Sequence, residues 1–158
     1  MRTVLLVVAV FAAVVLSLSV ATAQRGAYVA YLTGDEEVPR VTTTASGLCS
    51  FTLTPQGLSY WVMVFNLQET MQGHIHIGAA GANGPVAVWL YPPAPPPVQI
   101  QGAANGVIAT GTRTAANFVG PLAGQQMPAL ITALENGNAY CNVHTMRFGG
   151  GEIRGQIR

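Results

Sequence analysis

Short runs of β-forming residues separated by turn residues constrain the fold of this chain more than any other feature. Eight runs of five to nine residues are rich in Val, Ile, Thr, Tyr and Phe, and clusters of Gly, Pro and Asn separate them. Runs of this length and spacing are typical of a β-sandwich or β-barrel. The expected strands cover residues 28–33, 47–54, 58–66, 73–77, 86–90, 106–112, 138–145 and 152–158.

Two segments depart from this pattern. In residues 127–136, Pro128 suits the first helical position, the apolar residues fall on one face, and Gly137 suits the position after a helix. We expect one short crossover helix there. Residues 92–97 contain five prolines, which favours an extended connector at an edge, with a recognition segment as the alternative. The sequence therefore predicts an all-β antiparallel domain with a single short helix.

The first 23 residues have the pattern of a secretory signal peptide. A short basic start precedes an apolar run over residues 4–16, and the sequence Ala-Thr-Ala at 21–23 matches a cleavage site. The alternative is an uncleaved membrane anchor over residues 3–23, which would just span a bilayer. We therefore expect an exported protein with one domain over residues 24–158.

The chain carries very little charge. Charged residues make up 8% of it, the formal net charge is +1, and all the basic residues are arginines. This composition excludes the basic surface of a nucleic-acid-binding protein. It also gives little electrostatic resistance to association. An extracellular structural or adhesive module, which contacts protein partners or copies of itself through sheet edges or residues 92–97, is therefore one of two candidate functions.

The two cysteines should form a disulfide bond. An exported protein meets an oxidising compartment, where a bond between Cys49 and Cys141 is the default expectation. Successive side chains of a strand point to opposite faces, which puts Cys49 with Phe51 and Cys141 with Val143. These faces are apolar, so both cysteines should lie in the core.

The three histidines of the chain fall on the opposite, outward strand faces. His74 and His76 flank the inward Ile75, and His144 lies on the outward face of a later strand. A His-x-His strand holds its two rings about 6–7 Å apart, close enough to share an ion. With a third ring from a neighbouring strand, they would form a surface site for copper or zinc. The alternative is three half-exposed strand residues, each hydrogen-bonded to a neighbour.

Other polar residues near these strands have weaker signals. Glu152 and Arg154 share one strand face, which favours an ion pair or hydrogen-bond network that supports the sheet. The alternative is a role behind the ligands, where Glu152, Arg154 and Asn142 orient the histidine rings. Asp35, Glu36 and Glu37 are expected to be a solvated turn. No catalytic motif is present, so we assign no catalytic residue.

Several motifs, in order along the chain, resemble those of the CHRD (chordin-type) domain family. The resemblance covers about residues 28–157 and implies a secreted domain with an immunoglobulin-like or superoxide-dismutase-like antiparallel β-sandwich of about eight strands. The matching segments are Leu32-Thr33-Gly34, Glu36-Glu37-Val38-Pro39, Gly73-His74-Ile75-His76, the run from Gly81 to Val86, the run from Gly137 to Thr145 and the run from Gly150 to Ile157.

The histidine strands are also similar to two copper-ligand strands of copper/zinc superoxide dismutase. This similarity implies that His74, His76 and His144 are the ligands of one copper or zinc ion. The chain lacks the bridging fourth histidine and the zinc-loop cluster of that enzyme, so dismutase activity is not carried over. We therefore expect an exported, non-catalytic metal-binding domain, with the interaction module as the alternative and copper redox chemistry as a less favoured third reading.

Overall fold

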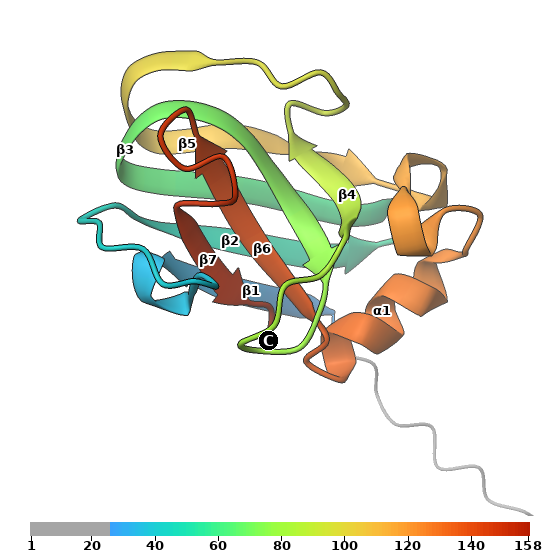
Figure 1. The fold of residues 1–158 in the computed structure, drawn as a ribbon. Helices are drawn as coiled ribbons and strands as arrows, with labels where there is room; N and C mark the ends of the chain where they lie inside the picture. Colours follow the sequence, from blue (N-terminus) through green and yellow to red (C-terminus); the bar gives the residue numbers. More distant parts are fainter. Residues whose placement is uncertain (1–25) are drawn as a thin grey trace, which may run out of the picture.

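The chain folds into an antiparallel all-β domain with one short α-helix (Figure 1). This computed structural model describes residues 26–158, so the predicted signal peptide lies outside the described residues. Within them, no helix is long and apolar enough to cross a membrane. The elements are β1 (Ala27–Thr33), β2 (Ser46–Thr54), β3 (Gly57–Ile77), β4 (Val86–Tyr91), β5 (Ile100–Arg113), α1 (Met127–Glu135), β6 (Ala139–Thr145) and β7 (Ile153–Gln156), with 3-10 turns at Gly34–Glu36, Ala115–Asn117 and Gly120–Leu122.

Five of the seven strands close into a small barrel. The strands pair in the order β2-β1-β7-β6-β3, and a further pairing between β2 and β3 completes the ring. The remaining strands, β4 and β5, both pair with β3 outside the ring. The all-β class is confirmed, but all the strands belong to one sheet that closes on itself, unlike the two-sheet sandwich that we expected.

The strand β3 organises the whole fold, because it is long enough to serve two sets of neighbours. Its first half pairs with β2 and β5, and its second half pairs with β6 and β4. The predicted strands 58–66 and 73–77 are therefore one element, so there are seven strands where we expected eight. Between the two halves, Asn66 and Glu69 have φ values of 54° and 50°, and the pairing with β5 shifts register there. These bulges bend the strand without ending it.

The disulfide bond crosses the interior of the barrel. Cys49 of β2 and Cys141 of β6 are bonded, and both are fully buried beside Phe51 and Val143. Since β2 and β6 are not neighbours in the ring, the bond joins opposite walls. The disulfide and the alternation that placed it in the core are both confirmed.

The predicted helix is also confirmed. α1 buries Leu130 and Leu134 against the barrel core and lies beside one end of the barrel (Figure 1). The proline-rich segment connects β4 to β5, and Pro93 and the residues that follow it through Gln99 are exposed.

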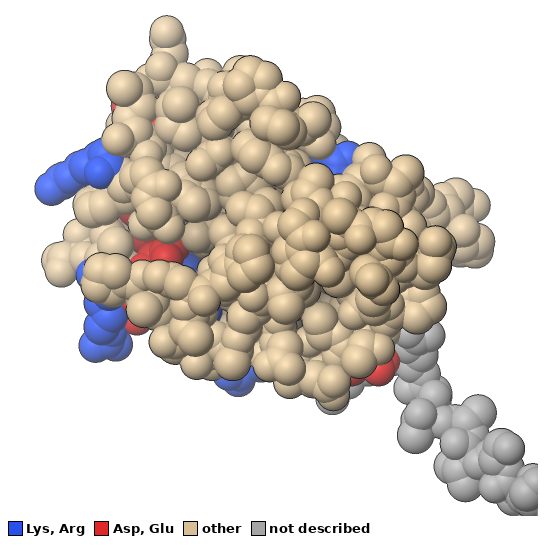
Figure 2. Space-filling view, turned by 45° about the vertical axis from the view of Figure 1, so that its right-hand side comes forward, with Lys and Arg blue, Asp and Glu red and all other residues tan. Residues whose placement is uncertain are grey.

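Charged side chains are sparse on the surface. In the face drawn in Figure 2, most of the area belongs to uncharged residues, and most of the arginines and acids gather toward the left of the view. Several large apolar side chains are exposed on the strands, among them Tyr31 at 73% and Phe65 at 45%.

Candidate metal centre

The outward faces of β3 and β6 are covered by loops and therefore buried. His74, His76 and His144 are only 1%, 7% and 6% exposed. The covering segments are residues 34–45, 78–85 and 146–152, each of which hydrogen-bonds to this face or to another covering loop. The alternation of strand residues predicted the face correctly, but the prediction of a surface site was wrong.

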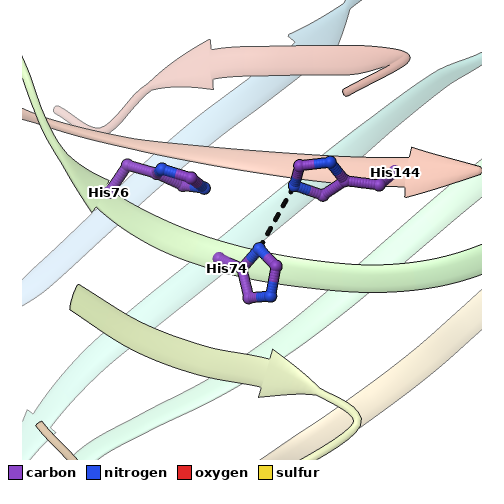
Figure 3. A group of neighbouring side chains, drawn as sticks. All are labelled: His74, His76 and His144. Atoms are coloured by element: carbon purple, nitrogen blue, oxygen red, sulfur yellow. Dashed lines mark hydrogen bonds between the residues drawn. The ribbon is translucent and has the colours of Figure 1, made fainter. Parts of the chain in front are cut away.

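The three histidine rings converge (Figure 3). His74 and His76 come from the second half of β3, and His144 comes from β6, whose register places it opposite Gln72. The ring centroids are 5.5 Å apart for His74 and His76, and 5.0 Å apart for His74 and His144. One nitrogen from each ring lies within 4.8 Å of the other two. The alternation of side chains predicts the faces, and the pairing of β3 with β6 brings the rings close together.

The hydrogen bonds of the rings fix which nitrogens carry lone pairs. His76 Nδ1 lies 2.9 Å from the carbonyl oxygen of Gly84, and His144 Nδ1 lies 2.9 Å from that of Gly149. A carbonyl only accepts, so both Nδ1 atoms donate, and both Nε2 atoms carry a lone pair. His74 Nδ1, 3.2 Å from His144 Nε2, then donates to it. Two lone pairs and one exchangeable proton therefore face the centre of the group.

This arrangement fits a metal ion. A tetrahedral ion with metal–nitrogen bonds of about 2.0–2.1 Å holds its nitrogen ligands roughly 3.3 Å apart. The His74–His144 nitrogens already have that separation, at 3.2 Å. Of the nitrogens that face the group, His76 Nε2 is buried and has no hydrogen-bond partner among the described residues. Backbone carbonyls that hold the far nitrogen of a ring are a usual device for orienting metal-binding histidines.

Burial also keeps the rings neutral, which metal binding requires. Loss of solvation, together with the smaller effects of His144 and His76, lowers the pKa of His74 to about 3. Burial likewise lowers the pKa of His144 to about 4, although the carbonyl of Gly149 opposes the shift. The pKa of His76 is lowered for the same reason.

A stack of side chains borders the site on the His76 side. The ring of His76 stacks on Tyr140, with centroids 4.8 Å apart and planes within 10°. The guanidinium of Arg154 lies over the ring of Tyr140, with its Cζ atom 3.4 Å from the ring centroid. Arg154 is 1% exposed and donates hydrogen bonds to carbonyls of the loop 78–85. It thereby holds the loop whose Gly84 carbonyl orients His76.

Asn142 and Glu152 have different partners. The side chain of Asn142 is a polar neighbour of His76. Each carboxylate oxygen of Glu152 accepts a hydrogen bond of 2.7 Å from a threonine hydroxyl, one from Thr43 and one from Thr145. Glu152 thus joins a covering loop to the end of β6, whereas the hydrogen bonds of Arg154 go to the loop 78–85.

Glu37 was missed at the sequence level. Asp35 and Glu36 are exposed as expected, but Glu37 is 4% exposed and faces inward. Burial raises its pKa to about 7, against the opposing effect of the Arg154 charge. Its only sequence signal is its place in the motif from Glu36 to Pro39, because no periodicity distinguishes it from the two acids before it.

The comparison with known families agrees with the motifs. The model of the CHRD domain matches residues 28–157, which is almost the whole described chain. The chain belongs to the CHRD domain family. No curated protein and no solved structure matches this CHRD domain, so its likeness to superoxide dismutase is not shown.

Without metal, the CHRD domain should lose stability in acid. In the unfolded chain the histidines take up protons at their usual pKa of about 6.5, whereas in the folded chain they do so only at a lower pH. The free energy of unfolding should therefore fall as the pH drops from 6.5 towards 4. His144 alone should contribute about 3 kcal/mol. Glu37 has the opposite sign between about pH 4.5 and 7, because its folded form keeps the proton. The three rings should outweigh it.

Urea unfolding of the metal-free protein from pH 4 to 8 measures this dependence. Glu37→Gln removes the opposing group and should make the rise between pH 4.5 and 6.5 steeper. A stability that stays constant or decreases over that interval would contradict the assignment of neutral, buried histidines.

Proposed function

We propose that this CHRD domain is an exported, non-catalytic metal-binding domain that holds one copper or zinc ion with His74, His76 and His144. The proposal rests on one observation: three neutral imidazoles, on two paired strands, bring one nitrogen each within 4.8 Å of the others in a buried position. Three histidines with an open position are a known arrangement for zinc, and imidazole also suits copper.

Copper is the first ion to test. The similarity of the two histidine strands to copper-ligand strands of superoxide dismutase supports this order. When bound, such an ion would supply a Lewis-acidic or redox centre. The protein's own residues contribute three neutral nitrogen ligands, two of which are oriented by the carbonyls of Gly84 and Gly149.

The test is metal binding by the purified protein at equilibrium, with copper and zinc offered separately. We expect one ion per chain for the parent protein and no tight binding by the triple variant His74→Asn, His76→Asn, His144→Asn. Asparagine keeps an amide that can donate to the same carbonyls, so the variant should fold, and thermal unfolding checks this. If the parent protein binds neither ion, the proposal fails and the interaction module becomes the leading function.

Tryptophan fluorescence gives a second readout. The ring of Trp89 lies 4.3 Å from that of His74, whereas Trp61 lies in the other half of β3, paired with Ser50 and Thr110. Bound copper(II) quenches nearby tryptophans, so Trp89→Phe should remove most of the copper-dependent quenching and Trp61→Phe should leave it. The reverse result would place the ion elsewhere.

A further inference from the structure

Two buried acids lie near the histidine site, and they differ in what occupies their oxygens. Glu37 and Glu152 are 4% and 7% exposed. Both oxygens of Glu152 are taken by threonine hydroxyls. Glu37 keeps one oxygen, Oε1, that is buried and has no hydrogen-bond partner among the described residues. Such a group is costly to bury, so a native structure that keeps one has a reason to do so.

Asn142 connects Glu37 to the site. Its side chain interacts with the carboxyl of Glu37 and with the ring of His76. A β-carbon at Gly151 would overlap both Glu37 Oε1 and the amide nitrogen of Asn142, so these two atoms share the space that this glycine leaves open. Asn142 Oδ1 and His76 Nε2 are, like Glu37 Oε1, buried without a partner in the described part of the chain. Buried polar atoms without a hydrogen-bond partner in the described residues thus extend from Glu37 to His76 Nε2, which faces the site.

The charges of the region favour a buried anion when a cation binds. Arg154 already places one positive charge under the covering loops, at 1% exposure, and a divalent ion among three neutral rings would add two more. Electrostatic attraction is stronger in a buried environment than in water. Glu37 interacts with the Arg154 charge and is connected through Asn142 to a ligand, whereas the oxygens of Glu152 are held by hydroxyls.

Glu37 is also close to solvent on one side. With Phe148 and Gly151, it lines a surface cavity of about 180 Å³. A cavity of this volume holds several water molecules, since one water occupies about 30 Å³ of liquid. Glu37 therefore borders both this cavity and Asn142, whose side chain leads to His76.

We propose that Glu37 is a positioning residue for the three-histidine site, which orients His76 through Asn142 and supplies the buried negative charge that a bound cation requires. This inference rests on the proposed function. It assigns Glu37 no contact with the ion itself. A partner behind a ligand typically changes metal affinity by about 10- to 100-fold.

The test compares Glu37→Gln with Glu36→Gln, a matched control that makes the same change at the exposed neighbouring acid. We measure the dissociation constant for copper(II) and the spectrum of the bound ion. Glu37→Gln should weaken binding by about 10- to 100-fold and shift the spectrum, and Glu36→Gln should change neither. Glu37→Asp, which keeps the charge, should recover part of the affinity. Glutamine is close in shape to the uncharged carboxyl, so the variant should fold, and thermal unfolding checks both replacements.

The outcomes separate this inference from the proposed function. If the parent protein binds no metal, the proposed function fails, and this inference fails with it. If the parent protein binds through its histidines and Glu37→Gln binds as tightly with the same spectrum, the inference alone is overturned. The inference is also overturned if Glu37→Asp binds copper(II) no more tightly than Glu37→Gln. If Glu37→Gln does not fold, Glu37→Asp takes its place, and binding as tight as that of the parent protein with an unchanged spectrum overturns the inference.

Discussion

Replacing Cys49 and Cys141 together with alanine should lower the free energy of unfolding by about 4–5 kcal/mol. The bond joins residues 92 positions apart, and closing so long a loop removes much of the conformational freedom of the unfolded chain. Both sulfur atoms are fully buried, so each alanine also leaves a small cavity. Urea unfolding of the parent protein and the double variant at one pH measures the difference.

The parent protein with its disulfide reduced is the control for this experiment. It lacks the cross-link but keeps the volume of both side chains, so it should show most of the loss. A difference below 1 kcal/mol between oxidised and reduced protein would show that the cross-link contributes little to the barrel.

The second large effect is expected for Arg154→Met, which should cost about 3–5 kcal/mol of stability. The guanidinium is almost fully buried on the ring of Tyr140, and it donates hydrogen bonds to the carbonyls of Ala79 and Ala82 and to the side-chain oxygen of Asn83. Methionine retains much of the volume, but it leaves these acceptors without their donor. The loop 78–85 should then loosen over the histidine site.

Arg40→Met is the matched control for Arg154→Met. Arg40 and its ion-pair partner Asp35 lie 3.8 Å apart, with side chains 75% and 77% exposed, so their interaction is screened by water. The control should change stability by less than about 1 kcal/mol. Equal losses in the two variants, measured by urea unfolding, would contradict the structural role assigned to Arg154.

The alternation of residues within strands predicted the inner face of the barrel well. Cys49 and Phe51, or Cys141 and Val143, are two positions apart, so their common face is fixed as soon as the strand is assigned. The helix over Met127–Glu135 was similarly local, since Pro128 and Gly137 mark its ends. These features depend on neighbours in the sequence, which is why they could be predicted.

Features that depend on distant segments could not be predicted in this way. We expected one strand to end at residue 66 and another to begin at residue 73, and only the pairing with β5 shows that Asn66 and Glu69 bulge a continuous strand. The burial of His76 and His144 comes with loops that fold back over β3 and β6. Alternation along a strand says which side a residue faces, but not what lies above that side.

The most direct test of the central claim is a count of the imidazole nitrogens bound to copper(II) in the loaded protein, by pulsed electron paramagnetic resonance. The chain has three histidines, so every imidazole ligand can be assigned by replacing one histidine at a time. Our account predicts three coordinated imidazoles in the parent protein and two in each of His74→Asn, His76→Asn and His144→Asn. A spectrum with one imidazole or none, or one unchanged by these replacements, would contradict it.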